Sequence, residues 1–559
     1  MKLPNWCHNF WPAPWPESQE QRNQPRIADC LFIFAVVIVS ALPYMFHLGF
    51  YCNDWGYMET LQRFSGHGLG ASFRAMTDWD SDLLMRPVQL TWLVLAFKVF
   101  GRNATPYHIV VSAVIGIVAV LLYLTLRELR SGRWLALTIA LVFGVLPHYS
   151  TDKVWISTNQ AGLCVAFALF GIYSLSKSLR PSERHSTTWM ALAVSAFILS
   201  FLSYEVALGL IVASAWTIGL RKYLEVRRSS KGGWKFLACL AGTTALLALM
   251  LLAKYHMQGK VTYHHHLFSR LGLLSRHAMA QAVLFNFWTY GLHMPSFLLR
   301  LYRDSALSLA ALGAAAAIAA AVMAYLWRSM EFAAIPSRLA CLWLIVIGFV
   351  LFALGYALFF HSPFMEFNSQ AYGNRVVIAS ALGAAFVMVA VAGLVCSIVK
   401  SGTLRVRAFS IVIGLICGVN SLTACGIAHY WVDAAERQSE VLKSVSANVH
   451  SLPHDSVLLL DGFCLNPGPV PVFYSDYDTT TRLHFAFGDD SLTGDVIAGD
   501  AQFEPQGVDG DVEGQYPYGD HLFIYNVQQK YLTTLPSQAA ANRYLQAMRP
   551  SGSNGCPAA

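Results

Sequence analysis

Long apolar runs alternate with short polar connections along most of the chain. Most runs are about twenty residues long, which matches the thickness of a bilayer core when the segment is helical. Spans 134–147 and 189–203 are shorter than a full crossing, which leaves a re-entrant helix pair as an alternative there. The pattern predicts an all-α polytopic membrane bundle of about eleven transmembrane helices. The predicted spans are residues 31–50, 106–127, 134–147, 154–176, 189–203, 206–220, 235–255, 306–327, 337–360, 376–398 and 408–430.

Basic residues are concentrated in every second connection. Such connections face the cytoplasm in most membrane proteins. We therefore expect residues 1–30 in the cytoplasm, residues 31–430 in the membrane region and residues 431–559 outside, in a multi-pass protein of the plasma membrane (the inner membrane of bacteria). The basic groups are Arg127, Arg130 and Arg133; Lys177, Arg180 and Arg184; Arg221, Lys222, Arg227, Arg228, Lys231 and Lys235; Arg328 and Arg338; and Lys400, Arg405 and Arg407.

The C-terminal region has the opposite charge balance. The whole chain has a net charge of +7 and is 55% hydrophobic, but residues 431–559 contain 16 acidic and only 6 basic residues. Strand-like segments at 456–460 and 521–527 lie between loops rich in Gly, Asp and Pro, which predicts a small α/β or mainly β exterior domain. A basic bundle beside anionic headgroups and an acidic exterior domain require no nucleic-acid partner.

Cys464 and Cys556 are the only cysteines in this exterior region. An oxidising compartment would allow them to form a disulfide, whereas a disordered C-terminus would leave Cys556 unpaired. The sequence contains no CxxC, HExxH or P-loop pattern. Soluble nucleotide chemistry is therefore not indicated.

Asp54 stands directly after the first predicted span, in the segment Tyr51-Cys52-Asn53-Asp54-Trp55-Gly56-Tyr57. A carboxylate at the end of an apolar span is costly unless it meets water, a cation or a reacting hydroxyl, so it is a candidate functional residue. Asp152 and Glu205 occupy similar positions at the outer ends of later spans. This distribution places the expected chemistry on the outer face.

The first exterior loop, residues 51–105, is long for a connection within a bundle. Residues 55–76 carry few charges and are expected to form an interfacial helix, and the apolar segment 88–100 is too short to span comfortably. We expect both segments to cover a cavity.

Two segments contain residue types that bind metal ions, but their spacing does not fit a metal site. The run Asp78-Trp79-Asp80-Ser81-Asp82 lacks the glycine and the glutamate of a calcium loop, and is predicted to be a solvated turn. Three consecutive side chains such as His264-His265-His266 cannot easily converge on one ion. We predict no metal-ligand set, although a divalent cation remains a possible cofactor.

An ordered series of motifs resembles the polyprenyl-phosphate-sugar-dependent glycosyltransferases of the GT-C fold, closest to the protein O-mannosyltransferase and TMTC-like branches. The likeness covers roughly residues 30 to 400, and the order of the motifs carries it rather than any single one. The segments are Asp54 after the first span, Leu84-Met85-Arg86-Pro87-Val88, residues 100–108, residues 146–155, residues 202–208 and Tyr372-Gly373-Asn374-Arg375-Val376-Val377-Ile378.

The resemblance implies an inverting transfer of a sugar from a polyprenyl-phosphate donor to a glycan, lipid or protein acceptor. Asp54 would act as general base on the acceptor hydroxyl, and cations would hold the phosphate leaving group. The implied phosphate ligands are Arg375, Arg86 and Lys153, although the two last-named could instead reach into lipid headgroups. Supporting polar residues would be Asp152, Glu205 and Asn53.

One position departs from the family pattern. Many members have two adjacent acids at the first-loop site, whereas this chain has Asn53-Asp54. The loss of one hard oxygen ligand puts metal use at this position in doubt.

Two other classes of function remain open. A flippase or transporter of a lipid-linked sugar would also have an outward cavity with cations, but it should show internal repeats or broken helices in matching halves, which we do not find. A non-catalytic envelope-assembly protein would explain the acidic C-terminal region but not the acids at the outer helix ends. An Asp54→Asn variant that keeps wild-type transfer would favour these alternatives.

Overall fold

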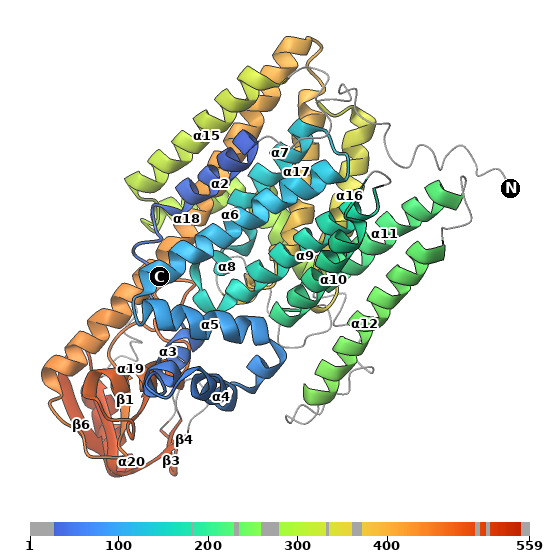
Figure 1. Cartoon of the computed structure of the whole chain (residues 1–559). Helices are drawn as coiled ribbons and strands as arrows, with labels where there is room; N and C mark the ends of the chain where they lie inside the picture. Colours follow the sequence, from blue (N-terminus) through green and yellow to red (C-terminus); the bar gives the residue numbers. More distant parts are fainter. Residues whose placement is uncertain are drawn as a thin grey trace.

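The computed structural model describes residues 27–180, 183–227, 234–258, 279–330, 335–359, 372–497, 503–509 and 515–548. In this part of the chain a large helical bundle has a small domain with strands at one end (Figure 1). The predicted fold class, a helical membrane bundle with a small strand-containing C-terminal domain, is confirmed.

Eleven described helices correspond to the eleven predicted spans. Seven described helices are long and apolar enough to cross a membrane, and the four other matches have shorter apolar stretches of 10 to 17 residues. The helices are α2 (Ile27–Ala41), α6 (Ala104–Glu128), α7 (Arg133–Val145), α9 (Asn159–Ser178), α10 (Ser186–Ser203), α11 (Leu208–Arg227), α12 (Trp234–Gln258), α15 (Leu309–Ser329), α16 (Arg338–Tyr356), α17 (Ile378–Cys396) and α18 (Gly402–Asn448).

The first predicted span was too long at its outer end. Helix α2 ends at Ala41, and a series of turns follows around Pro43. Proline disfavours helical geometry in the residue before it, so a helix tends to end there. The apolar run continues because Leu48 and Phe50 are buried inside the protein. An apolar pattern alone does not distinguish lipid contact from protein contact.

A further helical segment was not predicted. A π-helix, η4 (Leu284–Leu292), is followed by α14 (Met294–Arg303). Their side chains pack with Ile427 of α18 in one apolar cluster. This segment packs against α18 and adds a layer to the bundle.

The first exterior loop is helical throughout most of its length. It forms α3 (Asn53–Arg63), α4 (Leu69–Trp79), the short 3-10 helix η1 (Ser81–Met85) and α5 (Pro87–Phe100). The single interfacial helix expected over 55–76 is divided in two, because Gly68 between α3 and α4 has a φ of 81°. These helices share one buried apolar cluster that includes Met58, Met76 and Leu93.

The second exterior segment is short and buried. It consists of η2 (Pro147–Tyr149), α8 (Thr151–Val154) and η3 (Ile156–Thr158), and each of these residues is buried. A further short 3-10 turn, η7 (Tyr372–Asn374), contacts α8. The side-chain oxygen of Asn374 accepts a 3.0 Å hydrogen bond from the N–H of Thr151. The positions of Asp152 and Arg375 are therefore set by one packed unit.

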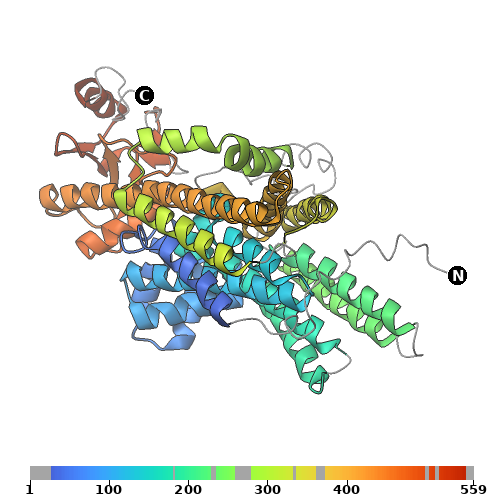
Figure 2. The same ribbon diagram turned by 90° about the horizontal axis from the view of Figure 1, so that it is seen from above.

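Helix α18 joins the bundle to the C-terminal domain without a break. It contains 47 residues and runs through the predicted domain boundary at 430/431, so the linker is a rigid helix. Seen from above, α18 (orange) extends along the bundle and into the domain (Figure 2).

The C-terminal domain is α/β. Strands β1 (Val457–Asp461) and β5 (Gly519–Asn526) match the two predicted strands. They form a four-stranded sheet of order β2-β1-β5-β6, in which β1 is parallel to β2 and β5 while β5 and β6 are antiparallel. The remaining elements are α19 (Asp476–Phe487), β2 (Thr493–Val496), β3 (Gly507–Asp509), β4 (Gln515–Pro517), β6 (Tyr531–Leu535) and α20 (Gln538–Met548).

The domain contains one described disulfide cysteine. Cys464 is disulfide-bonded, while its predicted partner Cys556 lies outside the described residues. The pairing of these two cysteines therefore stays a prediction.

Candidate active site

A cavity of about 530 Å³ lies where the two exterior segments of the bundle meet the C-terminal domain. Segments far apart in the sequence contribute to it, and three predicted site residues, Asn53, Arg86 and Arg375, line it. The complete lining is Asn53, Tyr57, Trp79, Asp80, Asp82, Arg86, Gln89, Trp155, Ser157, Thr158, Gln160, Ala161, Tyr204, Arg375 and Tyr477.

Aromatic rings form much of the wall. The rings of Tyr57 and Trp79 meet edge to face with centroids 4.9 Å apart, and Tyr477 approaches Trp79 at 6.1 Å. Gly56 makes this arrangement possible, because a Cβ atom there would lie 2.1 Å from the Trp79 ring. Aromatic walls with a few fixed polar groups are typical of small-molecule sites.

Asp54 lies directly behind this wall. It is 1% exposed; its Oδ1 accepts the N–H of Ser157 at 2.9 Å, and its Oδ2 accepts the N–H of Tyr51 at 3.1 Å. Burial raises the pKa of Asp54 to about 7, although the two N–H groups oppose the shift. Its neighbours Asn53 and Ser157 line the cavity, so only one layer separates the carboxylate from it.

The backbone before Asp54 is strained. Cys52 has a φ of 51°, in the left-handed region that a non-glycine residue seldom adopts. This turn precedes the first residue of α3. Such strain is often found at functional sites.

Asp80 and Asp82 face the cavity themselves. The Oδ2 of Asp80 accepts a 2.7 Å hydrogen bond from the Tyr57 hydroxyl, and its Oδ1 accepts the N–H of Asp82 at 3.0 Å. These residues were predicted to form a solvated turn; both are partly exposed, and in addition they line the cavity.

Arg86 is held by acidic neighbours. Its guanidinium lies 3.8 Å from Glu205, 3.9 Å from Asp82 and over the ring of Tyr204. Glu205 also contacts Lys254 at 3.0 Å. Burial would raise the pKa of Glu205, but the two cations bring it below its usual range. Glu205 is therefore ionised and fixes Arg86 at the cavity wall.

The positive charge of Arg375 is balanced by fewer acidic neighbours than that of Arg86, the other arginine in the cavity. Within the described ranges it forms no ion pair, and its guanidinium lies 5.8 Å from the centre of the Trp155 ring. Asp152 interacts electrostatically with Arg375 and is 1% exposed. Burial raises the pKa of Asp152 well above its usual range, which weakens its ability to neutralise Arg375.

Lys153 does not line the cavity. Its ammonium donates to the carbonyl oxygens of Gly144 at 3.2 Å and Leu146 at 2.9 Å, at the end of α7. A cation suits this position because the last carbonyls of a helix are partly negative.

The C-terminal domain reaches the cavity through α19. The hydroxyl of Tyr477 donates a 2.7 Å hydrogen bond to the side-chain oxygen of Asn53. Farther along, His484 contacts Glu59 at 2.5 Å, and the hydroxyl of Thr481 donates to Glu59 at 2.9 Å. These contacts dock α19 on α3.

One group of side chains at this contact could hold a metal ion. The ligand atoms of Glu59, His484 and Asp490 lie within 4.8 Å of one another. The guanidinium of Arg63 contacts Glu59 and lies 3.4 Å from Asp490, so a cation of the chain already balances the acids. The other metal candidate, His264-His265-His266, lies outside the described residues.

Asp80 and Tyr477 line the cavity but were not predicted as site residues. Asp80 was assigned to a turn, and Tyr477 carried no signal because it lies 424 residues from its partner Asn53. A single aromatic residue between two acids, in Asp78-Trp79-Asp80, was the available clue.

Comparisons with known proteins give one structural match to report. No family model and no curated protein matches the chain. A solved structure, described as ArnT from Cupriavidus metallidurans bound to undecaprenyl phosphate, is 13% identical, with 84% of this chain and 85% of that chain covered at a TM-score of 0.34. A TM-score of this size supports no conclusion about function. The function is therefore inferred from the geometry of the cavity.

Proposed function

We propose that this protein is an integral membrane glycosyltransferase that uses a polyprenyl-phosphate-linked sugar. The observation that carries the proposal is the combination of two arginines, acidic side chains and aromatic walls around one cavity at the outer end of the bundle. Transfer from a phosphate requires fixed positive charge for the leaving group and a base for the acceptor hydroxyl. The arginines at the cavity and the acids in and behind its wall support both roles.

Arg375 is proposed as the main ligand of the donor phosphate. It lines the cavity and has no ion pair among the described residues, so its N–H groups are available to donate hydrogen bonds to an anion. Arg86 would be the second ligand, oriented by Glu205. A planar guanidinium binds two phosphate oxygens at once, which suits a negative charge that grows during the reaction. Lys153 is not included, because its ammonium is occupied by carbonyl oxygens.

Asp54 is proposed as the general base. A pKa of about 7 makes its carboxylate a stronger base than an ordinary aspartate while leaving it substantially ionised at neutral pH. The acceptor hydroxyl would enter between Asn53 and Ser157. Its proton passes to Asp54, its oxygen bonds to the anomeric carbon with inversion, and the bond to phosphate breaks with its electron pair on the phosphate.

Asp80 is the competing candidate for the base. It lines the cavity directly, whereas Asp54 lies one layer behind. Burial raises the pKa of Asp54 to about 7, so the Asp54 assignment predicts a characteristic pH dependence. A pH–rate profile with a midpoint near 7 that disappears in an Asp54 variant would support Asp54.

The proposed orientation follows from the basic loops. The N-terminus would lie in the cytoplasm and the C-terminal domain outside, so the cavity would open to the exterior. The acceptor would be an envelope glycan, lipid or protein. Reporter fusions at the C-terminus would test this, and a cytoplasmic signal would contradict it.

The direct test is a transfer assay with purified protein, a polyprenyl-phosphate sugar and an envelope extract as acceptor. We expect transfer by the wild type and loss in Asp54→Asn, with donor binding retained. Glu504→Gln is a matched control, because Glu504 is an exposed acid of the C-terminal domain outside the cavity. Because two arginines can neutralise the leaving phosphate, we expect activity to persist after chelation of divalent cations.

Two further experiments distinguish this proposal from the alternative functions. Donor movement across reconstituted vesicles without transfer would indicate a flippase. An Asp54→Asn protein that restores a normal envelope in a deletion strain would indicate a non-catalytic assembly role. Analysis of envelope glycans in that strain would identify the acceptor by the sugar that is missing.

A further inference from the structure

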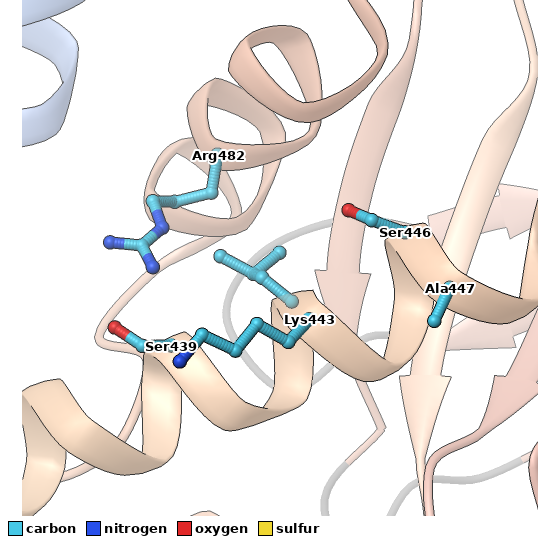
Figure 3. A pocket seen from close by; sticks show the side chains of 6 residues that line it. Ser439, Lys443, Ser446, Ala447 and Arg482 are labelled. Carbon is cyan, nitrogen blue, oxygen red and sulfur yellow. The ribbon is translucent and has the colours of Figure 1, made fainter.

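A second cavity, of about 560 Å³, lies on the C-terminal domain between α18 and α19. It is lined by Ser439, Leu442, Lys443, Ser446, Ala447 and Arg482. Figure 3 shows the guanidinium of Arg482 and the side chains of Ser439 and Lys443 directed into the same space from the two helices. We call this cavity the α18–α19 groove.

The charge of the groove is opposite to that of the domain around it. Residues 431–559 contain 16 acidic and 6 basic residues, yet two of the six bases line the groove and none of its lining residues is acidic. In the described part of the chain, neither Lys443 nor Arg482 makes an ion pair or a hydrogen bond. Positive charge in an acidic domain is therefore concentrated at one cavity.

Arg482 is fixed in place rather than free in solvent. Its guanidinium stacks over the ring of Trp55 in α3, 4.1 Å from the ring centre. Stacking holds the plane of the group and leaves its N–H edge available. Burial lowers the pKa of Arg482 to about 10, so the group stays charged at neutral pH.

The groove is close to the proposed active site. Arg482 follows Tyr477, which lines the main cavity, by five residues on α19, or about 8 Å along the helix axis. Helix α19 therefore contributes a residue to both cavities. Lys443 lies thirteen residues beyond the predicted membrane span that ends at residue 430, about 20 Å along α18, which puts the groove beyond lipid headgroups.

We propose that the α18–α19 groove binds a phosphate group carried by an oligosaccharide acceptor, and so selects anionic glycans. This rests on the proposed glycosyltransferase function. The guanidinium can hold two phosphate oxygens and the ammonium a third. The hydroxyl of Ser446 can add a further hydrogen bond, while that of Ser439 donates to the carbonyl of Ala435.

The test is a binding measurement without donor, on full-length protein in nanodiscs of neutral lipid. Titration calorimetry would compare glucose 6-phosphate, glucose and inorganic phosphate. We expect glucose 6-phosphate to bind, glucose not to bind, and the affinity to fall as salt rises. Inorganic phosphate should compete with glucose 6-phosphate.

The variant Lys443→Gln/Arg482→Gln should weaken binding of glucose 6-phosphate at least tenfold. The control Lys530→Gln/Arg543→Gln removes the same charge from exposed positions of the same domain and should bind normally. Asp54→Asn should also bind normally, which separates failure of the groove from failure of the proposed reaction. Equal affinities in the groove variant and the control would overturn the proposal. Loss of wild-type binding in nanodiscs of anionic lipid would assign the groove to headgroups and would also overturn it.

Discussion

The hydroxyl of Tyr477 donates a 2.7 Å hydrogen bond to the side-chain oxygen of Asn53, across 424 residues of sequence. Asn53 is the first residue of α3 and the neighbour of Asp54, and both hydrogen-bonded residues line the main cavity. The C-terminal domain is thus part of the cavity wall.

Tyr477→Phe tests whether this bond matters for turnover. Loss of the bond should cost about 1 kcal/mol of domain docking, because the amide oxygen of Asn53 loses its donor. We expect a several-fold lower turnover with nearly unchanged donor affinity, measured in the transfer assay. Tyr518→Phe is the control, since its hydroxyl bonds to Glu504 within the C-terminal domain. Equal turnover in both variants would show that docking does not depend on Tyr477.

Asp54→Asn should lower turnover by roughly two to four orders of magnitude, because an amide cannot take the proton. In the wild type, activity should fall as the pH drops below about 7, since burial raises the pKa of Asp54 to about 7 and the protonated form is inactive. Asp80→Asn should keep this midpoint. If Asp80→Asn abolishes turnover while Asp54→Asn does not, the base is Asp80.

Arg375→Ala should weaken donor binding as well as turnover, because it removes both charge and hydrogen-bond donors from the leaving phosphate. Arg375→Lys should restore only part of the loss, since an ammonium has no planar pair of N–H groups. Donor affinity can be measured by titration with a polyprenyl-phosphate sugar. Arg437→Ala is the control, because Arg437 pairs with Asp433 on α18, outside the cavity. Unchanged donor affinity in Arg375→Ala would remove Arg375 from the phosphate site.

The contact between Glu59 and His484 predicts pH-dependent docking of the C-terminal domain. Burial opposes both charges, but the contact lowers the pKa of Glu59 and raises that of His484. The glutamate contribution is lost as pH falls through its lowered pKa, and the histidine contribution is lost as pH rises through its raised pKa. Docking should therefore be strongest between about pH 5 and 6.5.

Hydrogen exchange of α19 across this pH range would measure the docking. Protection should be highest in the stated window and should lose its pH dependence in His484→Gln. A wild-type profile that is flat from pH 5 to 8 would contradict the role of this pair.

Cys464 is disulfide-bonded, and Cys556 is its predicted partner. The loop that a disulfide between Cys464 and Cys556 would close should stabilise the C-terminal domain by up to about 4 to 5 kcal/mol in the chain-entropy model. Peptide mapping of unreduced protein should recover a peptide that joins the two residues, and Cys556→Ser should lower the melting temperature. A free thiol at Cys556 in unreduced protein would disprove the pairing.

The sequence by itself determined the helical bundle. Apolar runs of membrane length and basic connections are local properties, so the eleven helices and the acidic C-terminal domain could be predicted, whereas helix ends such as Ala41, the segment η4–α14 and the division of α3 from α4 could not. The sequence also singled out Asp54, because a carboxylate beside an apolar run needs a reason wherever the chain folds. Arg86 and Arg375 were selected by motif and do line the cavity.

Only the tertiary structure decided which side chains share one space. Asp80 lines the cavity, where the hydroxyl of Tyr57 in α3 donates to its carboxylate, and Lys153 is excluded because its ammonium donates to a carbonyl at the end of α7. The pairing of Tyr477 with Asn53 and of Arg482 with Trp55 depends on how a rigid α18 places the C-terminal domain against α3. Such contacts arise from the packing of distant segments, so they cannot be predicted from the local pattern of apolar and polar residues.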